Sequence, residues 1–335
     1  MKIVFSEGSG LNDSIYGKCQ APIRMFLEQR GEQFEQASVL KNLFLMGVSD
    51  NYGDLMTTMT AMSGFDPVGE NGAYPDDGMQ EGFNKFLVYD TWKDSFRISA
   101  EIIEDSKLMD FKRQPAAFMT SYNRTRELFG AALYAGALNG GKKIKYRGRE
   151  FDITAADGEP LFSKAHPPKV CGKKQSNLFS DAFSVDALGR METKMHLFKG
   201  DTDEILDVAP DTILIPEDAD AKKAVFAAIG ADKDPLTANN AFNYQYGRWT
   251  VIVWSYLNQF LNASATFPWV LLDSKYNTTY GGAVWNDRVR LAVRSTIDEN
   301  TDANVWRGRS RFNATFNDWR FACAGGVSGG DSLPG

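Results

Sequence analysis

Histidine and cysteine are scarce in this chain of 335 residues, which holds two histidines and three cysteines. Cys19, Cys171 and Cys323 lie far apart and in no metal-ligand spacing, so we interpret them as reduced thiols of an intracellular protein. His166 and His196 stand in neither a HExxH motif nor a His-Asp-Ser arrangement, which argues against most zinc and hydrolytic chemistries. We therefore expect no catalytic site, no metal site and no cofactor.

Long apolar runs and a basic excess are also missing. No apolar run approaches the roughly 18 residues of a membrane span, and the N-terminus lacks a signal-peptide core, so we expect neither membrane insertion nor secretion. A net charge of −6 argues against tight nucleic-acid binding, although weak contact through one face stays open. No glycine-rich phosphate loop opens a predicted helix, so a nucleotide site has no support.

Apolar material is abundant, at 43% of the residues with 23 Phe and 7 Trp, which predicts a globular chain. A chain of 335 residues is longer than a single hydrophobic core usually supports. We therefore expect two lobes, or one lobe from which long segments project. From about 181 to 275, helices and strands alternate and predict a compact α/β lobe. The predicted helices cover 186–198 and 221–229, and the predicted strands cover 212–216, 249–254 and 269–273.

A long helix is predicted from Pro115 to Asn139. Apolar or aromatic residues recur at helical spacing in one stripe, at Phe118, Tyr122, Phe129, Leu133 and Ala137, with Thr125 filling the one gap. Pro115 suits a first-turn position, and Asn139-Gly140-Gly141 is a stop signal. About 25 residues at a rise of 1.5 Å make a rod of roughly 37 Å, which we call the spine helix. Its many small residues permit close packing, so its stability must come from its neighbours.

The segment 51–98 is predicted to form a long hairpin that stands away from the core. Glycines and prolines break its middle into turns, and residues 86–89 and 95–98 have the composition of strands. Such a hairpin leaves sheet edges open in a monomer and is useful as an arm that lies on a neighbour.

Three shorter segments also carry recognisable sequence patterns. Before the hairpin, one helix is expected to start at Ala21 and end near Gly31, and a second to cover 34–45. Residues 142–149 are basic without interleaved aromatics, so we favour a solvated hairpin strand over a nucleic-acid patch. His166 stands beside two prolines with no partner at metal spacing, which favours a packed turn histidine over a ligand.

Arginine is concentrated near the end of the chain, where residues 285–320 hold seven arginines and no lysine. Apolar residues alternate with Arg288, Arg290 and Arg294, which predicts a strand with one buried and one basic face. Arg307, Arg309 and Arg311 line one face of a predicted return strand. Because the guanidinium fork suits bidentate pairing with carboxylates, we favour ordered bridges between elements or subunits, with an exposed basic face as the alternative.

The order of these segments resembles the tailed-phage major capsid proteins over about residues 50–325. The resemblance rests on the hairpin, the W-x3-F-x-I-S segment with its acidic EIIED continuation, the spine helix ending in LNGG, the TILIP and PWVLLD strands and the final arginine-rich strands. The sequence is most similar to Mu-type major head subunits, whose DGxxLFSxxHP signature occupies 157–167.

The resemblance implies an α+β chain of the HK97-like capsid fold with peripheral and axial domains. The implied division is an N-terminal arm (1–50), an extended loop (51–98), a peripheral domain (99–175 and 276–325), an axial domain (176–275) and a flexible tail (326–335). It further implies a homo-oligomer of hexamers and pentamers that closes into an icosahedral shell around phage double-stranded DNA, held by weak non-specific contact. Portal, scaffold and decoration proteins are implied partners, assembly in the host bacterial cytoplasm is the implied route, and the virion is the implied location.

Residues at subunit contacts are expected among the cations of the extended loop and the arginine-rich strands. These candidates are Lys85, Lys93, Arg288, Arg290, Arg294, Arg307, Arg309 and Arg311. Some relatives form autocatalytic Lys–Asn cross-links, which would need a loop lysine near an asparagine such as Asn313 or Asn317. The spacing does not place the general base that this reaction requires, so we do not expect it.

Two other functions compete with a virion shell. A cellular nanocompartment of the same fold would enclose a cargo enzyme in place of DNA. A hydrolase would use His166 with a nearby serine such as Ser163, and replacing His166 by alanine would abolish its activity.

Overall fold

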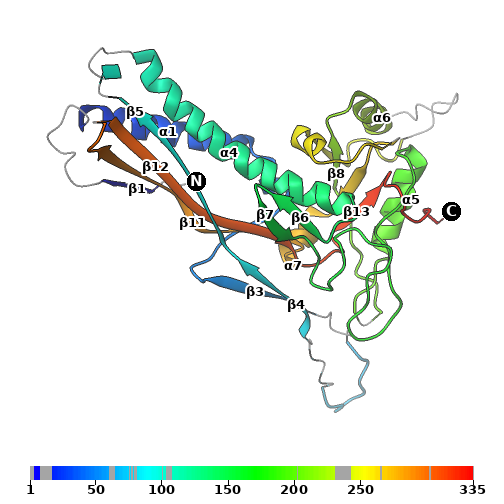
Figure 1. The fold of residues 1–335 in the computed structure, drawn as a ribbon. Helices are drawn as coiled ribbons and strands as arrows, with labels where there is room; N and C mark the ends of the chain where they lie inside the picture. Colours follow the sequence, from blue (N-terminus) through cyan, green and yellow to red (C-terminus); the bar gives the residue numbers. More distant parts are fainter. Residues whose placement is uncertain are drawn as a thin grey trace.

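The computed structural model describes residues 4–7, 17–59, 65–74, 76, 78, 81–99, 101–102, 108–201, 203–230, 243–264, 266–301 and 303–334. The molecule is elongated, with a long sheet and two helices at one end and a compact lobe that holds the C-terminus at the other (Figure 1). The fold mixes helices and sheets, so the predicted α+β class is confirmed.

The spine helix is present as α4 (Leu108–Leu138), which is 31 residues long. The predicted stripe is buried at Phe118, Thr125, Phe129, Leu133 and Ala137. The predicted start was wrong, because Pro115 lies inside the helix rather than in its first turn. An internal proline removes one hydrogen bond and costs about 3 kcal/mol; the burial of the helix offsets this cost.

Close packing along α4 depends on its glycines, as its composition predicted. A Cβ added to Gly130 would lie 2.4 Å from Cδ2 of Leu40, and one added to Gly136 would lie 2.2 Å from Cγ2 of Ile144. Leu40 belongs to the short helix α2 (Leu40–Leu43) and Ile144 to β6 (Lys143–Tyr146). The two glycines therefore let neighbouring elements approach the helix backbone.

The main sheet has the order β1 (Val4–Glu7), β11 (Ala283–Asp298), β12 (Ala303–Phe316), β5 (Asp90–Ile98). β11 and β12 are antiparallel from Ala283–Phe316 to Asp298–Ala303, with irregularities in register between Asp287 and Ala292. β2 (Leu45–Val48) also pairs with β11, in parallel. The predicted arginine-rich strand pair is thus the centre of this sheet, and the described residues 299–301 lie in the turn that follows β11.

One face of the main sheet is covered by α4 and by α1 (Gly17–Ala37). Toward the end of the sheet, Ile23 and Leu27 of α1 pack with Phe118 of α4 and Trp306 of β12. Nearer the lobe, Phe129 stands among aromatic rings, with ring centroids 4.9 Å from Phe151, 5.5 Å from Trp92, 5.8 Å from Trp285 and 6.1 Å from Phe312. The spine helix therefore organises the core, as its stripe predicted.

The N-terminal helices differ from the prediction. α1 continues through Gly31 to Ala37 as a single helix, and only the four residues of α2 follow it. Gly31 is buried, so the position favours a residue without a side chain, and packing overrides the low helix propensity of glycine.

The projecting hairpin consists of β3 (Gly53–Met59) and β4 (Glu81–Val88), which are antiparallel. It extends away from the main sheet (Figure 1). Residues 95–98, predicted as part of this hairpin, lie instead in β5, which pairs with β12. The strand composition was recognised, but its partner lies more than 200 residues away in the sequence.

The compact lobe is built on a four-stranded sheet with the order β13 (Ala322–Gly325), β10 (Trp269–Leu272), β8 (Thr212–Pro216), β9 (Thr250–Trp254). β8 and β10 are buried at every position. The predicted helices are present as α5 (Val185–His196) and α6 (Ala219–Ile229), whose N-caps are Ser184 and Asp218. The short helices η1 (Ser255–Gln259) and α7 (Ser274–Tyr280) complete the lobe.

The predicted basic hairpin is formed by β6 and β7 (Arg149–Asp152). Its two turn residues, Arg147 and Gly148, both have positive φ, which fits the twist of a tight hairpin. The C-terminal tail was predicted to be flexible, and this was wrong. Leu333 is buried and its N–H donates to Asp181 at 2.8 Å, which fixes the tail to the lobe.

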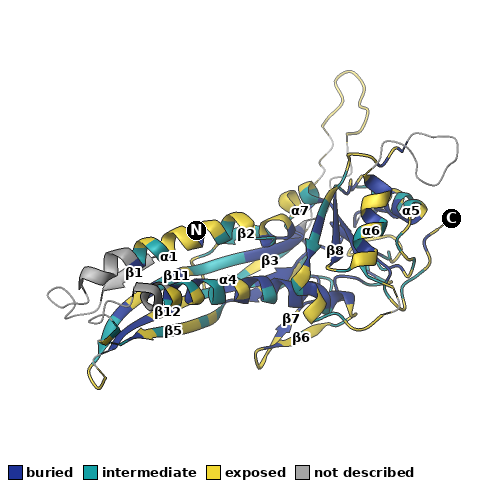
Figure 2. Cartoon of the chain, turned by 90° about the horizontal axis from the view of Figure 1, so that it is seen from above, coloured by how far each residue is buried: buried dark blue, intermediate teal, exposed yellow. Residues whose placement is uncertain are grey.

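Burial follows the strands at the centre of the molecule. Figure 2 shows buried residues along the strands of the lobe and of the main sheet, whereas the outer sides of α1 and α6 are exposed. The exposed sides are those that face away from these strands.

Candidate interaction surfaces

The uncovered face of the main sheet carries exposed cations from three neighbouring strands. Lys93 of β5 stands directly opposite Arg309 of β12, and Arg294 of β11 stands directly opposite Arg307. We call these four residues the basic face. Like charges that face each other across strands destabilise a sheet. Within the described ranges, no carboxylate lies at ion-pair distance from any of the four.

The basic face lines a shallow depression of about 550 Å³. Asp94 lies at its edge, where its carboxylate accepts hydrogen bonds from Ser95 N–H and from Ser121. A second depression of about 550 Å³ adds Arg149, which is paired with Asp90. Cationic side chains from β5, β7, β11 and β12 therefore gather on one surface that could hold an anionic partner.

The other predicted contact residues are distributed elsewhere. Lys85 on β4 is almost buried and donates to the Thr154 carbonyl, with Asp152 3.7 Å away. Burial lowers the pKa of Lys85, and Asp152 opposes this effect. Arg311 donates to the Tyr89 carbonyl at 3.2 Å. Both residues thus bind their own chain, where they fix the base of the hairpin.

Arg288 and Arg290 lie where the register of β11 and β12 shifts, so the regular alternation predicted for them is interrupted. Arg288 is half-buried, and Arg290 is exposed at the edge of a groove. The structure thus brings together four of the eight predicted residues on one surface, and the sequence alternation identified three of these four.

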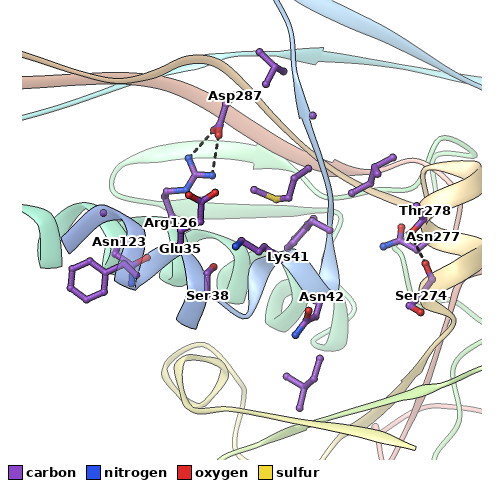
Figure 3. A pocket seen from close by; sticks show the side chains of 18 of the residues that line it. Glu35, Ser38, Lys41, Asn42, Asn123, Arg126, Ser274, Asn277, Thr278 and Asp287 are labelled. Carbon is purple, nitrogen blue, oxygen red and sulfur yellow. Dashed lines mark hydrogen bonds and ion pairs between the residues drawn. The ribbon is translucent and has the colours of Figure 1, made fainter. Parts of the chain in front are cut away.

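The groove beside Arg290 measures about 810 Å³ and runs between the N-terminal segment and α4. Figure 3 shows Glu35, Ser38, Lys41 and Asn42 on one side of it and Ser274, Asn277 and Thr278 on another. The wall also includes the apolar side chains Met46 and Val48 of β2, which are both exposed. Its lining is mixed, without a dominant charge.

At the base of this groove, Arg126 of α4 forms a bidentate pair with Asp287 of β11, at 2.8 and 3.1 Å (Figure 3). The guanidinium also lies over the rings of Trp285, at 4.8 Å, and Phe312, at 5.1 Å. Burial alone would lower the pKa of Arg126, but Tyr122 and Asp287 raise it above its usual value. Sequence reasoning missed this pair, although a charge within an apolar helix stripe was a signal for it.

Glu127 is a second buried charge that joins separate elements. Its carboxylate accepts hydrogen bonds from the Ser38 hydroxyl at 2.6 Å, Val39 N–H at 3.2 Å and Trp254 Nε1–H at 3.1 Å. Burial raises the pKa of Glu127, and these hydrogen bonds oppose the shift. The residue therefore links the α1–α2 junction, the spine helix and strand β9.

The tip of the hairpin is exposed at every described position from 65 to 74. Phe65 is 107% exposed and Tyr74 is 97% exposed, so the described part of the chain leaves both aromatic rings accessible. Closer to the base, Leu55 and Phe86 stand opposite each other and are 63% and 56% exposed. Exposed apolar side chains gathered on one projecting element mark an interaction surface.

The proposed hydrolytic pair does not have the geometry of a catalytic site. His166 is buried, and its two ring nitrogens face Asp157 at 2.6 Å and Asn177 at 3.1 Å. Its ring stacks on Trp319 at 4.2 Å. The Ser163 hydroxyl accepts from Ala165 N–H instead of meeting the imidazole. His166 is packed in the interior, as predicted, but it forms a β-bridge with Gln175 and does not lie in a turn.

Among the residues that the structure describes, no cluster of three or more His, Cys, Asp or Glu side chains could hold a metal ion. None of the described helices is both long enough and apolar enough to cross a membrane.

A family model described as "Phage capsid protein" matches residues 90–325. No curated protein matches the sequence. Among solved structures, the capsid of Ralstonia phage GP4 is 11% identical with a TM-score of 0.48, covering 86% of this chain and 90% of that chain. A chain of Mycobacterium phage Patience is 11% identical with a TM-score of 0.48, covering 100% and 96%. A virus-like particle from Pyrococcus furiosus is 10% identical with a TM-score of 0.45, covering 91% and 97%.

The matched range includes β5, the spine helix, the whole lobe and both arginine-rich strands, which is well over half of the sequence. This match to a phage capsid family favours a phage capsid over a cellular nanocompartment. The chain belongs to the phage capsid protein family.

Proposed function

We propose that this chain is the major head subunit of a tailed phage, with the HK97-type fold, and that it assembles as hexamers and pentamers into an icosahedral shell around double-stranded DNA. The observation that carries the proposal is the projecting hairpin, whose aromatic tip is left exposed by the described part of the chain. The entropy cost of ordering such an arm is offset only when a neighbouring subunit buries it. Family membership supports the same conclusion.

The proposed division of the subunit follows the resemblance. Residues 1–50 act as an N-terminal arm and 51–98 as the extended loop. Residues 99–175 and 276–325 make the peripheral domain, and 176–275 make the axial domain. The resemblance of the signature at 157–167 to Mu-type head subunits supports a place in the Mu-type branch, and a gene neighbourhood of Mu-type head genes is the expected finding.

Charge complementarity indicates where two subunits meet. Residues 60–84, at the far end of the hairpin, hold five acidic residues and no lysine or arginine. The basic face carries four exposed cations whose mutual repulsion is not balanced within the described chain. An acidic tip on the basic face of a neighbour would relieve both imbalances, and arginine would supply bidentate contacts to its carboxylates.

The remaining partners follow from the role of a head subunit. Portal, scaffold and decoration proteins are the candidate further partners of such a shell, and the host bacterial cytoplasm is the proposed place of assembly. Contact with the packaged DNA is weak and non-specific, because the net charge of −6 opposes strong attraction to phosphate. The finished location is the virion.

Sedimentation of the purified protein tests the proposal. Wild-type chains of 37.2 kDa should form particles that sediment far ahead of a monomer. A stable monomer in every salt, pH and scaffold condition would contradict the proposed function.

The contact residues are tested separately by charge reversal. Lys93→Glu with Arg309→Glu should reduce particle formation at least tenfold while leaving the monomer folded. The matched control is Lys223→Glu on the exposed side of α6 in the lobe. Adding Asp66→Lys and Glu70→Lys to the first pair should restore assembly, and no restoration would place the acidic tip elsewhere.

A further inference from the structure

Two asparagines that face each other across the main sheet hold the two strands of the projecting hairpin. Asn286 of β11 and Asn313 of β12 are direct partners in the strand register. On β12, Asn313 follows Arg309 of the basic face by four residues, so the period of two places both on the uncovered face. Figure 1 shows the hairpin leaving the sheet on the side away from α4. The uncovered face therefore carries the base of the hairpin as well as the basic face.

Asn286 holds the start of β3 through a hydrogen-bonded group. Its Nδ2 donates to Oδ2 of Asp54 at 3.3 Å and to the Tyr89 hydroxyl at 3.1 Å. The Tyr89 hydroxyl donates to the same carboxylate. Oδ1 of Asp54 accepts from Ser49 at 2.9 Å and from Asn51 at 3.0 Å. Because an ionised carboxylate only accepts hydrogen bonds, the Asn286 amide can bind it in this one orientation.

Asn313 holds the other strand of the hairpin. Its Nδ2 donates to the Val88 carbonyl at 2.7 Å, and its Oδ1 accepts from Ala314 N–H at 2.8 Å, so the orientation of this amide is fixed as well. Arg311 supports the same corner by donating to the Tyr89 carbonyl at 3.2 Å. Val88 is the last residue of β4, so both strands are held at the end nearest the sheet. We call Asn286 and Asn313 the socket.

Lys85 makes a further contact away from the socket. It lies three residues along β4 from Val88, which is a separation of about 10 Å. Its ammonium is almost buried, donates to the Thr154 carbonyl and lies 3.3 Å from the Thr154 hydroxyl. Beyond it, the Phe83 ring lies 5.0 Å from the ammonium of Lys169. A body held at two points can still rotate about the line between them, and a contact away from that line prevents the rotation. We call Lys85 with Thr154 the latch.

We propose that the socket and the latch fix the direction in which the hairpin projects, and that this direction determines the size of the shell. The second half of the proposal rests on the proposed function. The eight residues of β4 span about 27 Å, so a tilt of about 10° at the base would move the far end by about 5 Å. The tip is exposed at every described position from 65 to 74, so the base alone aims it at a neighbour. The angle between adjacent subunits then follows the hairpin, and this angle determines how the shell closes.

A distance measured within one chain tests the first half without requiring assembly. Spin labels are attached at Asn84→Cys on β4 and Lys275→Cys on α7, both exposed positions, in a chain that also carries Cys19→Ser and Cys171→Ser. Cys323 is buried and needs no replacement. The full chain is measured before assembly and is diluted with unlabelled chain, so that pulsed electron paramagnetic resonance records only the distance between hairpin and lobe.

The latch variant is Lys85→Met, which keeps an unbranched side chain and removes its donor, and the socket variant is Asn313→Ala. The wild type and the matched control Lys223→Met, on the exposed side of α6, should give one narrow distance. Each of the two variants should shift or broaden this distance by at least about 5 Å. A role in stability alone would leave the distance unchanged. The same narrow distance in all four chains would overturn the proposal.

Electron microscopy of the same four chains, without labels, tests the second half. The wild type and Lys223→Met should form shells of one diameter, whereas Lys85→Met and Asn313→Ala should form shells of a different diameter or of several diameters. Wild-type diameters from both variants would overturn the link between hairpin direction and shell size. No particles from any of the chains would contradict the proposed function and this link together, and the distance measurement would still decide the first half.

Discussion

Replacing Phe129 by alanine removes the side chain on which the aromatic core is centred. Phe129 is fully buried, and its ring meets Phe151 edge-on at 4.9 Å with Trp92 and Trp285 within 5.8 Å. Truncating a buried phenylalanine to alanine costs about 3–5 kcal/mol. A typical domain has about 5–15 kcal/mol in total, so we expect the variant to retain only part of its stability.

The assay is chemical denaturation followed by tryptophan fluorescence, at one protein concentration because assembly shifts apparent stability. The matched control is Phe226→Ala on α6, where the side chain is 50% exposed and the same truncation should change stability by about 0.5 kcal/mol or less. Equal stability of the two variants would refute the assignment of Phe129 to the core. The harsher Phe129→Asp should abolish both folding and shell formation, and normal particles from it would refute the same assignment.

Two buried charges give further predictions. Asp287→Ala should lower the free energy of unfolding by about 3–5 kcal/mol, because it leaves Arg126 buried without its partner. Arg126→Met combined with Asp287→Leu should recover most of this loss. Equal losses in the two variants, measured by chemical denaturation, would contradict the pairing. For Glu127, burial raises the folded pKa above the ordinary 4.5, so the folded state binds the proton more tightly. Relative to Glu127→Gln, the wild type should therefore lose stability as the pH rises from 4.5 through the raised pKa of Glu127. The loss is up to tenfold in the folding equilibrium constant per pH unit. Parallel pH profiles of the two proteins would contradict the raised pKa.

Local patterns in the sequence predicted the elements whose burial follows a regular period. The stripe from Phe118 to Ala137 identified the spine helix, and the alternation around Arg307 and Arg309 identified a strand with one basic face. Both predictions depend on the pitch of one element and on which side faces the core, and neither needs knowledge of a partner.

The errors concern partners that are distant in the sequence. Pro115 was interpreted as a helix-starting signal and Gly31 as a helix-ending signal, yet α4 begins before Pro115 and α1 continues beyond Gly31. Residues 95–98 were recognised as a strand, but β12 rather than the hairpin is their partner. The tail was predicted to be flexible from its glycines, yet Leu333 is held by Asp181. In each case a contact across the fold overrode a local propensity.

For the candidate surfaces too, local patterns predicted exposure but not the partners of each residue. Alternation predicted the exposed arginines of the basic face, because exposure is a property of one strand. It could not predict that Lys93 stands opposite Arg309, that Lys85 turns back to Thr154, or that Arg126 pairs with Asp287, because these depend on register and on packing between elements. The opposed cations that indicate a partner are visible only in the structure.

Electron cryomicroscopy of the purified product tests the central claim most directly. We expect closed icosahedral shells of hexamers and pentamers, in which the acidic hairpin tip of one subunit lies on the basic face of its neighbour. A field of monomers, or shells in which Lys93 and Arg309 face solvent with no acidic partner, would contradict it.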